Sequence, residues 1–179
     1  MNSTERSHRR SARHLPVGVF SSRSLHFDSI TNTLILSGAT KETLLPQLYV
    51  RKIAEPAYAS VASIVGQRIH AVEGIVSWVL GHGELFCMLA EVGQFAENVR
   101  PVRTIGLAKV ELCQMNVEIW RGSLDGLIIS ELVCADRDGI LHAIVGVRAA
   151  DSLGHVNYHT INWVTGDVRH VEAMPDIFF

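Results

Sequence analysis

The chain has 179 residues, a formal net charge of −2, 47% hydrophobic and 19% charged residues, and a mean hydropathy of +0.20. This length predicts one domain, and the composition is too apolar for a disordered chain. The longest apolar runs are broken by Glu73, His82 and Glu84, so no transmembrane helix is expected. Three cysteines outside any CxxC motif, with no secretory signal peptide, favour reduced thiols and a cytoplasmic location.

Residues 1–24 are rich in Ser, Arg and His and hold five of the 16 basic side chains beside one acid, Glu5. We expect a flexible basic N-terminal tail here, because chain ends are usually mobile, followed by a single acidic domain over residues 25–179. A solvated leader is the simplest interpretation. Contact with nucleic acid, and an export or transit address, are the alternatives for such a segment.

The next elements mix strands and helices. Strand-forming residues on both sides of residues 28–32 predict a hairpin, and Thr40 is placed to cap a short helix that carries Leu48. Apolar residues at helical spacing after a proline predict the main helix over residues 57–72. Residues 74–92 then predict a hairpin whose arms are apolar on both faces, which is typical of central strands.

The rest of the chain predicts a β-meander, because its strand candidates are separated by the turn sequences GSLDG, DRDG, ADSLG and TGD. No internal repeat is visible in the sequence, which argues against repeat architectures. The expected fold class is therefore α+β: an antiparallel β-meander of about five to seven strands packed on one main helix, as two layers or a half-barrel.

The shortest hairpin at each turn gives a register for the meander. It places Cys113 opposite Cys134, Leu132 opposite Ala143, and Cys134 opposite Leu141, so one face is almost wholly apolar. We expect the main helix to cover that face. The facing cysteines are interpreted as small buried hydrophobic side chains, because a reducing compartment disfavours a disulfide.

The opposite face mixes polar, charged and aromatic side chains, which is typical of a ligand cleft or a subunit interface. Its candidate binding residues are Glu118, Trp120, Glu131, His142, Arg148, Asn157, Trp163 and His170. Arg148, expected opposite Asn157, has the planar fork that recognises a carboxylate or phosphate. His142 beside Trp163, and His170, are the groups of this face that titrate near neutral pH.

One pair on this face suggests catalysis. The predicted register places His159 opposite Glu172, where the carboxylate would orient the imidazole as a general base. A modest surface pair is the plainer interpretation of the same two residues. The HxxxH spacing of His155 and His159 does not support a metal site, because on a strand these residues lie about 13 Å apart.

Residues 154–157 read GHVN and follow Asp151, and they resemble the GHVN signature of hotdog-fold acyl-CoA thioesterases. In that family the motif lies early in the domain and opens toward the long helix. Here it follows the expected main helix and 22 residues remain beyond it. Because this order does not fit the family, we attribute no activity to the match.

The function best supported by the sequence is a cytoplasmic binding or regulatory protein that dimerises, or holds a small, partly apolar ligand, on its mixed face. The alternatives are a small metal-free enzyme that uses His159 and Glu172, and an exported effector or partner-binding protein addressed by residues 1–24. No phosphate-binding loop, nucleophile elbow or HExxH motif is present, so no cofactor is expected. Nucleic acid is expected to bind only through the basic tail, because the body is acidic.

Overall fold

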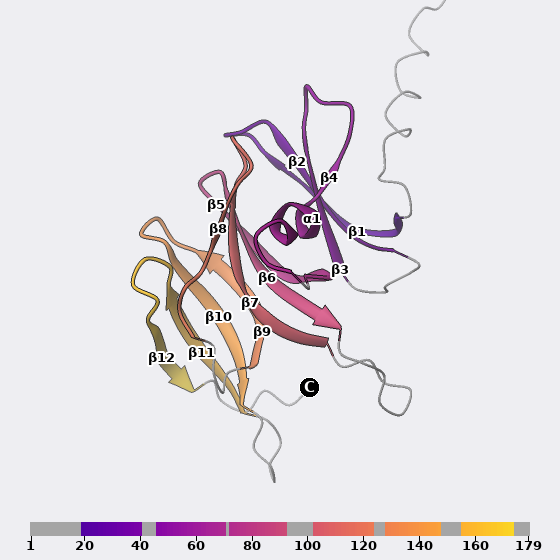
Figure 1. The fold of residues 1–179 in the computed structure, drawn as a ribbon. Helices are drawn as coiled ribbons and strands as arrows, with labels where there is room; N and C mark the ends of the chain where they lie inside the picture. Colours follow the sequence, from indigo (N-terminus) through magenta and orange to yellow (C-terminus); the bar gives the residue numbers. More distant parts are fainter. Residues whose placement is uncertain are drawn as a thin grey trace, which may run out of the picture.

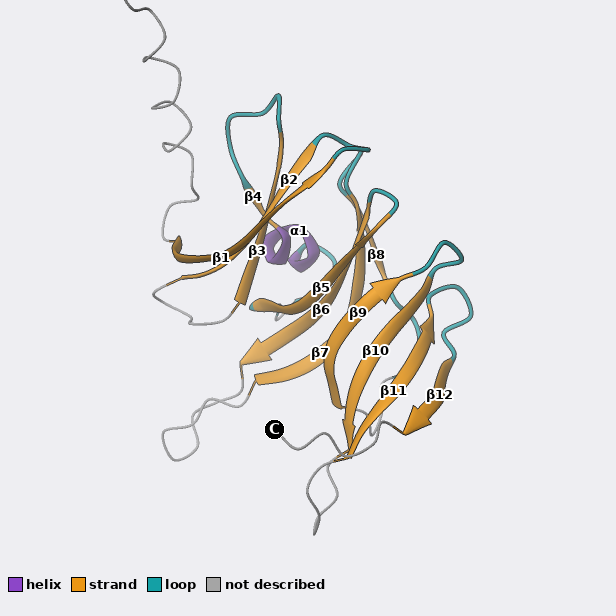
Figure 2. Cartoon of the chain, turned by 180° about the vertical axis from the view of Figure 1, so that it is seen from behind, coloured by secondary structure: helices purple, strands orange, loops and turns teal. Residues whose placement is uncertain are grey.

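The computed structural model of the chain describes residues 19–40, 46–70, 72–92, 102–123, 128–147 and 155–173. This part forms three four-stranded antiparallel sheets and one short helix (Figures 1 and 2). The first sheet contains β1 (Val19–Asp28), β2 (Thr33–Thr40), β3 (Pro46–Lys52) and β4 (Ala59–Ser60). The middle sheet contains β5 (Gly74–Gly81), β6 (Glu84–Val92), β7 (Val102–Glu111) and β8 (Asn116–Ile119). The third contains β9 (Ile128–Ala135), β10 (Ile140–Val147), β11 (His155–Asn162) and β12 (Val168–Ala173), and the helix is α1 (Val61–Gly66).

The three sheets are stacked face to face, with the middle sheet between the other two (Figure 1). Side chains of a strand alternate between its two faces. Leu85, Cys87 and Leu89 of β6 therefore pack with the first sheet and α1, whereas Phe86 and Met88 pack with the third sheet. Two hydrophobic cores result, one on each face of the middle sheet.

Local turn chemistry explains the hairpins within each sheet. His82 and Gly83 join β5 to β6 with φ values of 49° and 78°, the left-handed pair that defines a type I′ hairpin turn. In the turn between β1 and β2, the Asp28 carboxylate accepts hydrogen bonds from the backbone N–H groups of Ile30 (3.3 Å) and Thr31 (3.1 Å). The hairpins predicted around residues 28–32 and within residues 74–92 are thus confirmed.

The predicted main helix over residues 57–72 is wrong, and so is the α+β fold class that depended on it. Only α1 is helical in this segment, and its six residues rise about 9 Å, which is too short to cover a sheet. Ser60 caps it by accepting a hydrogen bond from the Ser63 backbone N–H at 3.3 Å. Of the short helix predicted after Thr40, Leu48 lies in β3 and residues 41–45 lie outside the described part. No described helix has the length and apolar character needed to span a membrane.

The single meander after residue 101 is also corrected. Strand β8 pairs with β7 and not with β9, so GSLDG is a link between two sheets instead of a hairpin turn. Cys113 consequently lies in the turn before β8, away from Cys134, and both are exposed free thiols. The link begins at Trp120, whose indole N–H donates to the Asn162 carbonyl oxygen at 3.2 Å and so joins the middle sheet to the third.

Within the third sheet, β-bulges change the register that the turns predicted. Leu132 does lie opposite Ala143, but a bulge places Cys134 opposite His142 instead of Leu141. A second bulge, between Tyr158 and His159, places Glu172 opposite Tyr158, and His159 pairs with His170. A bulge adds one residue to one strand, so every later side chain on that strand changes its partner. The predicted pairing of His159 with Glu172 is therefore wrong.

The predicted mixed face is divided between two surfaces. His159, Ile161 and Trp163 share the inner face of the third sheet with the buried Leu141, and they point toward the middle sheet. His142 pairs with Thr160 and belongs to the outer face. Strand β1 begins at Val19, inside the segment predicted as tail, and residues 1–18 lie outside the described part.

Candidate functional site

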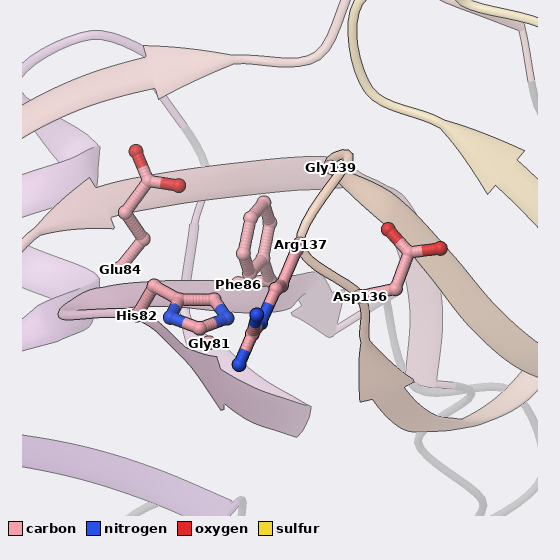
Figure 3. Close-up of a pocket in the computed structure, with 7 residues that line it drawn as sticks. All are labelled: Gly81, His82, Glu84, Phe86, Asp136, Arg137 and Gly139. Carbon is pink, nitrogen blue, oxygen red and sulfur yellow. The ribbon is translucent and has the colours of Figure 1, made fainter.

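A pocket of about 470 Å³ opens where the β5–β6 turn of the middle sheet meets the β9–β10 turn of the third sheet (Figure 3). Its lining contains three charged side chains, one histidine, one phenylalanine and two glycines. The lining residues are Gly81, His82, Glu84, Phe86, Asp136, Arg137 and Gly139. Because both turns belong to hairpins, the backbone that carries these side chains is fixed by the sheet hydrogen bonds on either side.

Close packing of β5 against β9 defines one side of the pocket. A Cβ atom added at Gly81 would lie 3.1 Å from the Cβ atom of Ala135, so the small residue permits this approach. Deeper between the same two sheets, the Ser77 hydroxyl accepts a hydrogen bond from the Leu132 backbone N–H at 3.0 Å. The pocket therefore lies on a junction held by packing and by a hydrogen bond.

Asp136 is fixed by its own turn. Its Oδ1 atom accepts hydrogen bonds from the backbone N–H groups of Ile140 and Asp138, both at 2.9 Å. The bond from Ile140 contributes most, and together with the bond from Asp138 and the nearby His142 imidazole it lowers the pKa of Asp136 below its ordinary value. The carboxylate is therefore an anion at neutral pH that already has hydrogen-bond donors.

Glu84 is held from the other side by a lysine network. The Lys109 ammonium lies 3.1 Å from a carboxylate oxygen of Glu84 and 3.1 Å from one of Glu118. Burial favours the neutral amine, but the hydrogen bonds to Glu118 and Glu84 outweigh it and raise the pKa of Lys109. For Glu118, burial likewise opposes ionisation, but Trp163 and Lys109 outweigh it and lower the pKa.

Arg137 differs from the other two charged residues of the pocket. It is exposed, and it forms no ion pair with any residue in the described part of the chain. Glu84 shares the Lys109 ammonium with Glu118, and the Asp136 anion accepts the hydrogen bonds of its turn. The guanidinium of Arg137, with the exposed His82 imidazole beside it in Figure 3, is the charged group of the pocket that has no ion pair with a described residue.

An aromatic pair supplies the apolar side. Phe86 is buried and lines the pocket, and its ring contacts the Trp163 ring edge to face at a centroid distance of 5.3 Å. The Lys109 ammonium lies 5.8 Å from the Trp163 ring centroid, within the range of a cation–π interaction. The same small region therefore offers an apolar surface and one unpaired cationic fork.

Three of the residues predicted from sequence lie near this pocket. Trp120 and Trp163 are buried in the core between the middle and third sheets, and Glu118 joins the lysine network. The other predicted binding residues are not brought together with them. His142 bonds to Tyr158 through Nδ1 on the outer face of the third sheet, and Glu131 is exposed there.

The remaining predicted residues lie elsewhere. Arg148 is outside the described residues, and Asn157 pairs with Val145 in β10, so the predicted partnership of Arg148 with Asn157 is wrong. His159 lies in the middle of β11, three residues from the strand end beside the β9–β10 turn, and it meets His170 with ring centroids 5.2 Å apart. Because Glu172 pairs with Tyr158, the acid–base pair predicted for His159 has lost its geometric basis.

The pocket itself was missed by the sequence analysis. His82 and the pair Asp136–Arg137 occupy two turns that were interpreted only as turn formers, and Glu84 was predicted as the start of a strand. One feature of the sequence could have indicated the pocket: Arg137 is a charged residue at a position where the turn does not require a charge. The hydrogen bonds that Asp136 accepts in this turn come from Asp138 and Ile140, and Arg137 contributes none of them. Only the stacking of the two sheets shows that these turns share one pocket.

Comparison with models of known protein families and with curated protein sequences gives no match to this chain. The chemistry of the site must therefore be judged from its own residues. Within the described residues, no group of three or more His, Cys, Asp or Glu side chains is arranged to hold a metal ion.

Proposed function

We propose that this chain is a binding protein that holds the anionic group of a small, partly apolar ligand in the pocket between the β5–β6 and β9–β10 turns. The observation that carries the proposal is the unpaired guanidinium of Arg137 beside two carboxylates that already have partners. A buried or half-buried ligand anion would supply the partner that Arg137 lacks.

The pocket also limits the ligand's size and character. A volume of about 470 Å³ falls within the range of small-molecule sites, and the Phe86 ring offers an apolar wall. The planar fork of Arg137 matches a carboxylate or a phosphate group through two parallel hydrogen bonds. We therefore expect a carboxylate or phosphate attached to an apolar body, with His82 as a second donor.

Phenyl phosphate is a suitable probe, since it joins a phosphate group to an aromatic ring. In an NMR titration of the full-length protein, it should shift the signals of Arg137 and Phe86, and inorganic phosphate should bind more weakly. Arg137→Gln should weaken phenyl phosphate binding by about 10- to 100-fold. This loss of affinity corresponds to the free energy of one hydrogen bond to a charged group. Arg169→Gln removes another exposed arginine on the third sheet and should leave binding unchanged.

The proposal fails if phenyl phosphate shifts no pocket signal, or if the Arg137 and Arg169 variants bind it equally well. It also fails if the ring alone, supplied as benzyl alcohol, binds as tightly as phenyl phosphate. That result would mean that the pocket recognises apolar surface without any contribution from the guanidinium.

A second candidate function, self-association, is favoured by exposed apolar residues on the first sheet. His26 contacts Trp78 of the middle sheet at a ring distance of 5.0 Å, so its neighbours Leu25 and Phe27 point to the outer face. Leu25 and Phe27 are 60% and 50% exposed, and Ile30 in the adjacent turn is 66% exposed. Such a patch is typical of an interaction surface.

A second copy of the chain is the partner we propose for this patch, through a two-fold symmetric contact. Leu36 and Tyr49, which share this outer face on β2 and β3, are already buried, so the exposed apolar surface is confined to β1 and the turn that follows it. A contact of this size is at the weak end of specific interfaces, so we expect a reversible dimer. Sedimentation velocity over a hundredfold concentration range should show a dimer that Leu25→Lys abolishes and Val164→Lys, in a distant turn, preserves. A strictly monomeric protein, or a dimer insensitive to Leu25→Lys, would refute this contact.

A further inference from the structure

Two imidazole rings face each other across neighbouring strands of the third sheet, away from the pocket. His159 of β11 and His170 of β12 are direct cross-strand partners, because the bulge after Tyr158 brings them into register. Their ring centroids lie 5.2 Å apart, and the ring planes meet at 77°. The pairing is a consequence of the bulge, so the sequence pattern did not reveal it.

His159 carries an unexplained polar atom. The residue is 7% exposed, and its Nδ1 atom is buried with no hydrogen-bond partner in the described part of the chain. Leaving a buried polar atom unsatisfied is unfavourable, and such an atom often marks the place of a bound ion or water. His170 is exposed, so its own ring is accessible from solvent.

The spacing of the rings fits one shared metal ion. A zinc–nitrogen bond is about 2.0–2.1 Å long, so two imidazoles on one tetrahedral ion have ring centroids about 5 Å apart. The observed centroid distance of 5.2 Å is close to this value. His155 and His159 lie too far apart along one strand to share an ion. The structure instead gives His159 a partner from the next strand, His170.

We propose that His159 and His170 form a two-histidine site for a borderline transition-metal ion such as Zn²⁺ or Ni²⁺. Imidazole nitrogens select these ions over Mg²⁺ and Ca²⁺, which prefer oxygen ligands. Water completes the coordination on the exposed side, since no third protein ligand lies nearby among the described residues. The ligands must be neutral imidazoles, so a bound metal ion takes the place of any proton on the two ring nitrogens.

Calorimetric titration of the metal-free, untagged, full-length protein with Zn²⁺ tests the site. The titration is made in a Cys113→Ser/Cys134→Ser background, because both thiols are exposed and would themselves bind zinc. We expect one ion per chain with His159 and His170 present, and at least a tenfold loss of affinity in His170→Gln. This variant alters an exposed side chain, so the fold should survive, and far-ultraviolet circular dichroism checks it.

His142→Gln is the matched control. Its imidazole lies on the same sheet but on the opposite face, with Tyr158 at one ring nitrogen and Asp136 at the other. It should change Zn²⁺ affinity less than twofold. Ni²⁺ should broaden the ring signals of His159 and His170 in NMR spectra, and Mg²⁺ should not. Absence of saturable Zn²⁺ binding, equal affinity in His170→Gln, or an equal loss in His142→Gln would each overturn the site.

Discussion

The link between the middle and third sheets can be tested by one added methyl group. Gly122 follows β8 and lies directly under the ring of Trp120, whose indole N–H bonds across to the third sheet. A Cβ atom at this position would overlap the Trp120 ring and would also lie 2.6 Å from the backbone carbonyl oxygen of Gly166. Neither obstacle is the free end of a flexible side chain, so Gly122→Ala must displace a buried ring or a turn.

The cost follows from overpacking. Forcing additional volume into a packed region typically destabilises a protein by about 1–3 kcal/mol. For a chain of this size, each kcal/mol lowers the melting temperature by about 2–4 °C, so Gly122→Ala should lower it by about 2–12 °C. Thermal unfolding followed by circular dichroism measures this change, and near-ultraviolet spectra report whether the Trp120 environment is altered.

Gly66→Ala supplies the matched control with the opposite sign. Gly66 ends α1, and an added Cβ atom there has no neighbour within 4 Å. Alanine should stabilise the helix by about 0.4–1 kcal/mol, because it restricts the unfolded chain and has the higher helix propensity. If Gly122→Ala is as stable as the original protein, or if both variants shift the melting temperature equally, the proposed packing of the link is incorrect.

Three further predictions concern the core and its charges. The pKa of Glu118 lies below its ordinary value of 4.5, so its stabilising effect is present above that pH and is lost as the pH falls through the lowered pKa. Urea unfolding should therefore show Glu118→Gln less stable than the original protein at pH 7, with the difference vanishing in acid. Burial raises the pKa of the Cys87 thiol, whereas Cys113 and Cys134 are exposed, so a thiol reagent should modify those two in the native state and Cys87 after denaturation. Ser77→Ala removes the acceptor of a β9 backbone N–H and should cost about 1–3 kcal/mol in the same unfolding assay.

The features predictable from sequence were those set by neighbouring residues. The hairpin at His82-Gly83 was predicted from the apolar runs on both sides of this pair, and both residues adopt the positive φ values of a type I′ turn. The DRDG and TGD turns were recognised from their turn-forming residues, and each joins two paired strands of the third sheet. In these two turns only Gly139 and Gly166 have positive φ, at 75° and 78°. GSLDG has the same composition but links two sheets, because the indole of Trp120 anchors the chain to Asn162 beyond it. Turn composition shows where a chain bends, but not which strand it then pairs with.

Side-chain faces were predicted less well, because one bulge reverses them. Leu132 opposite Ala143 was correct, yet the adjacent bulge moved Cys134 to face His142. The bulge at Tyr158 separated His159 from Glu172 and gave it His170 as a partner. No residue type at these positions requires a bulge, so a register extrapolated from the turns loses accuracy along the strand.

The apolar pattern of β5 and β6 was interpreted correctly, but the element that covers it was not. Both faces of this hairpin are apolar, which requires a covering layer on each side. The sequence predicts a main helix as one of these layers, whereas the structure places a four-stranded sheet on each side (Figure 2). The proposed pocket follows from the same geometry, because stacking brings two unrelated turns together and leaves Arg137 unpaired between them.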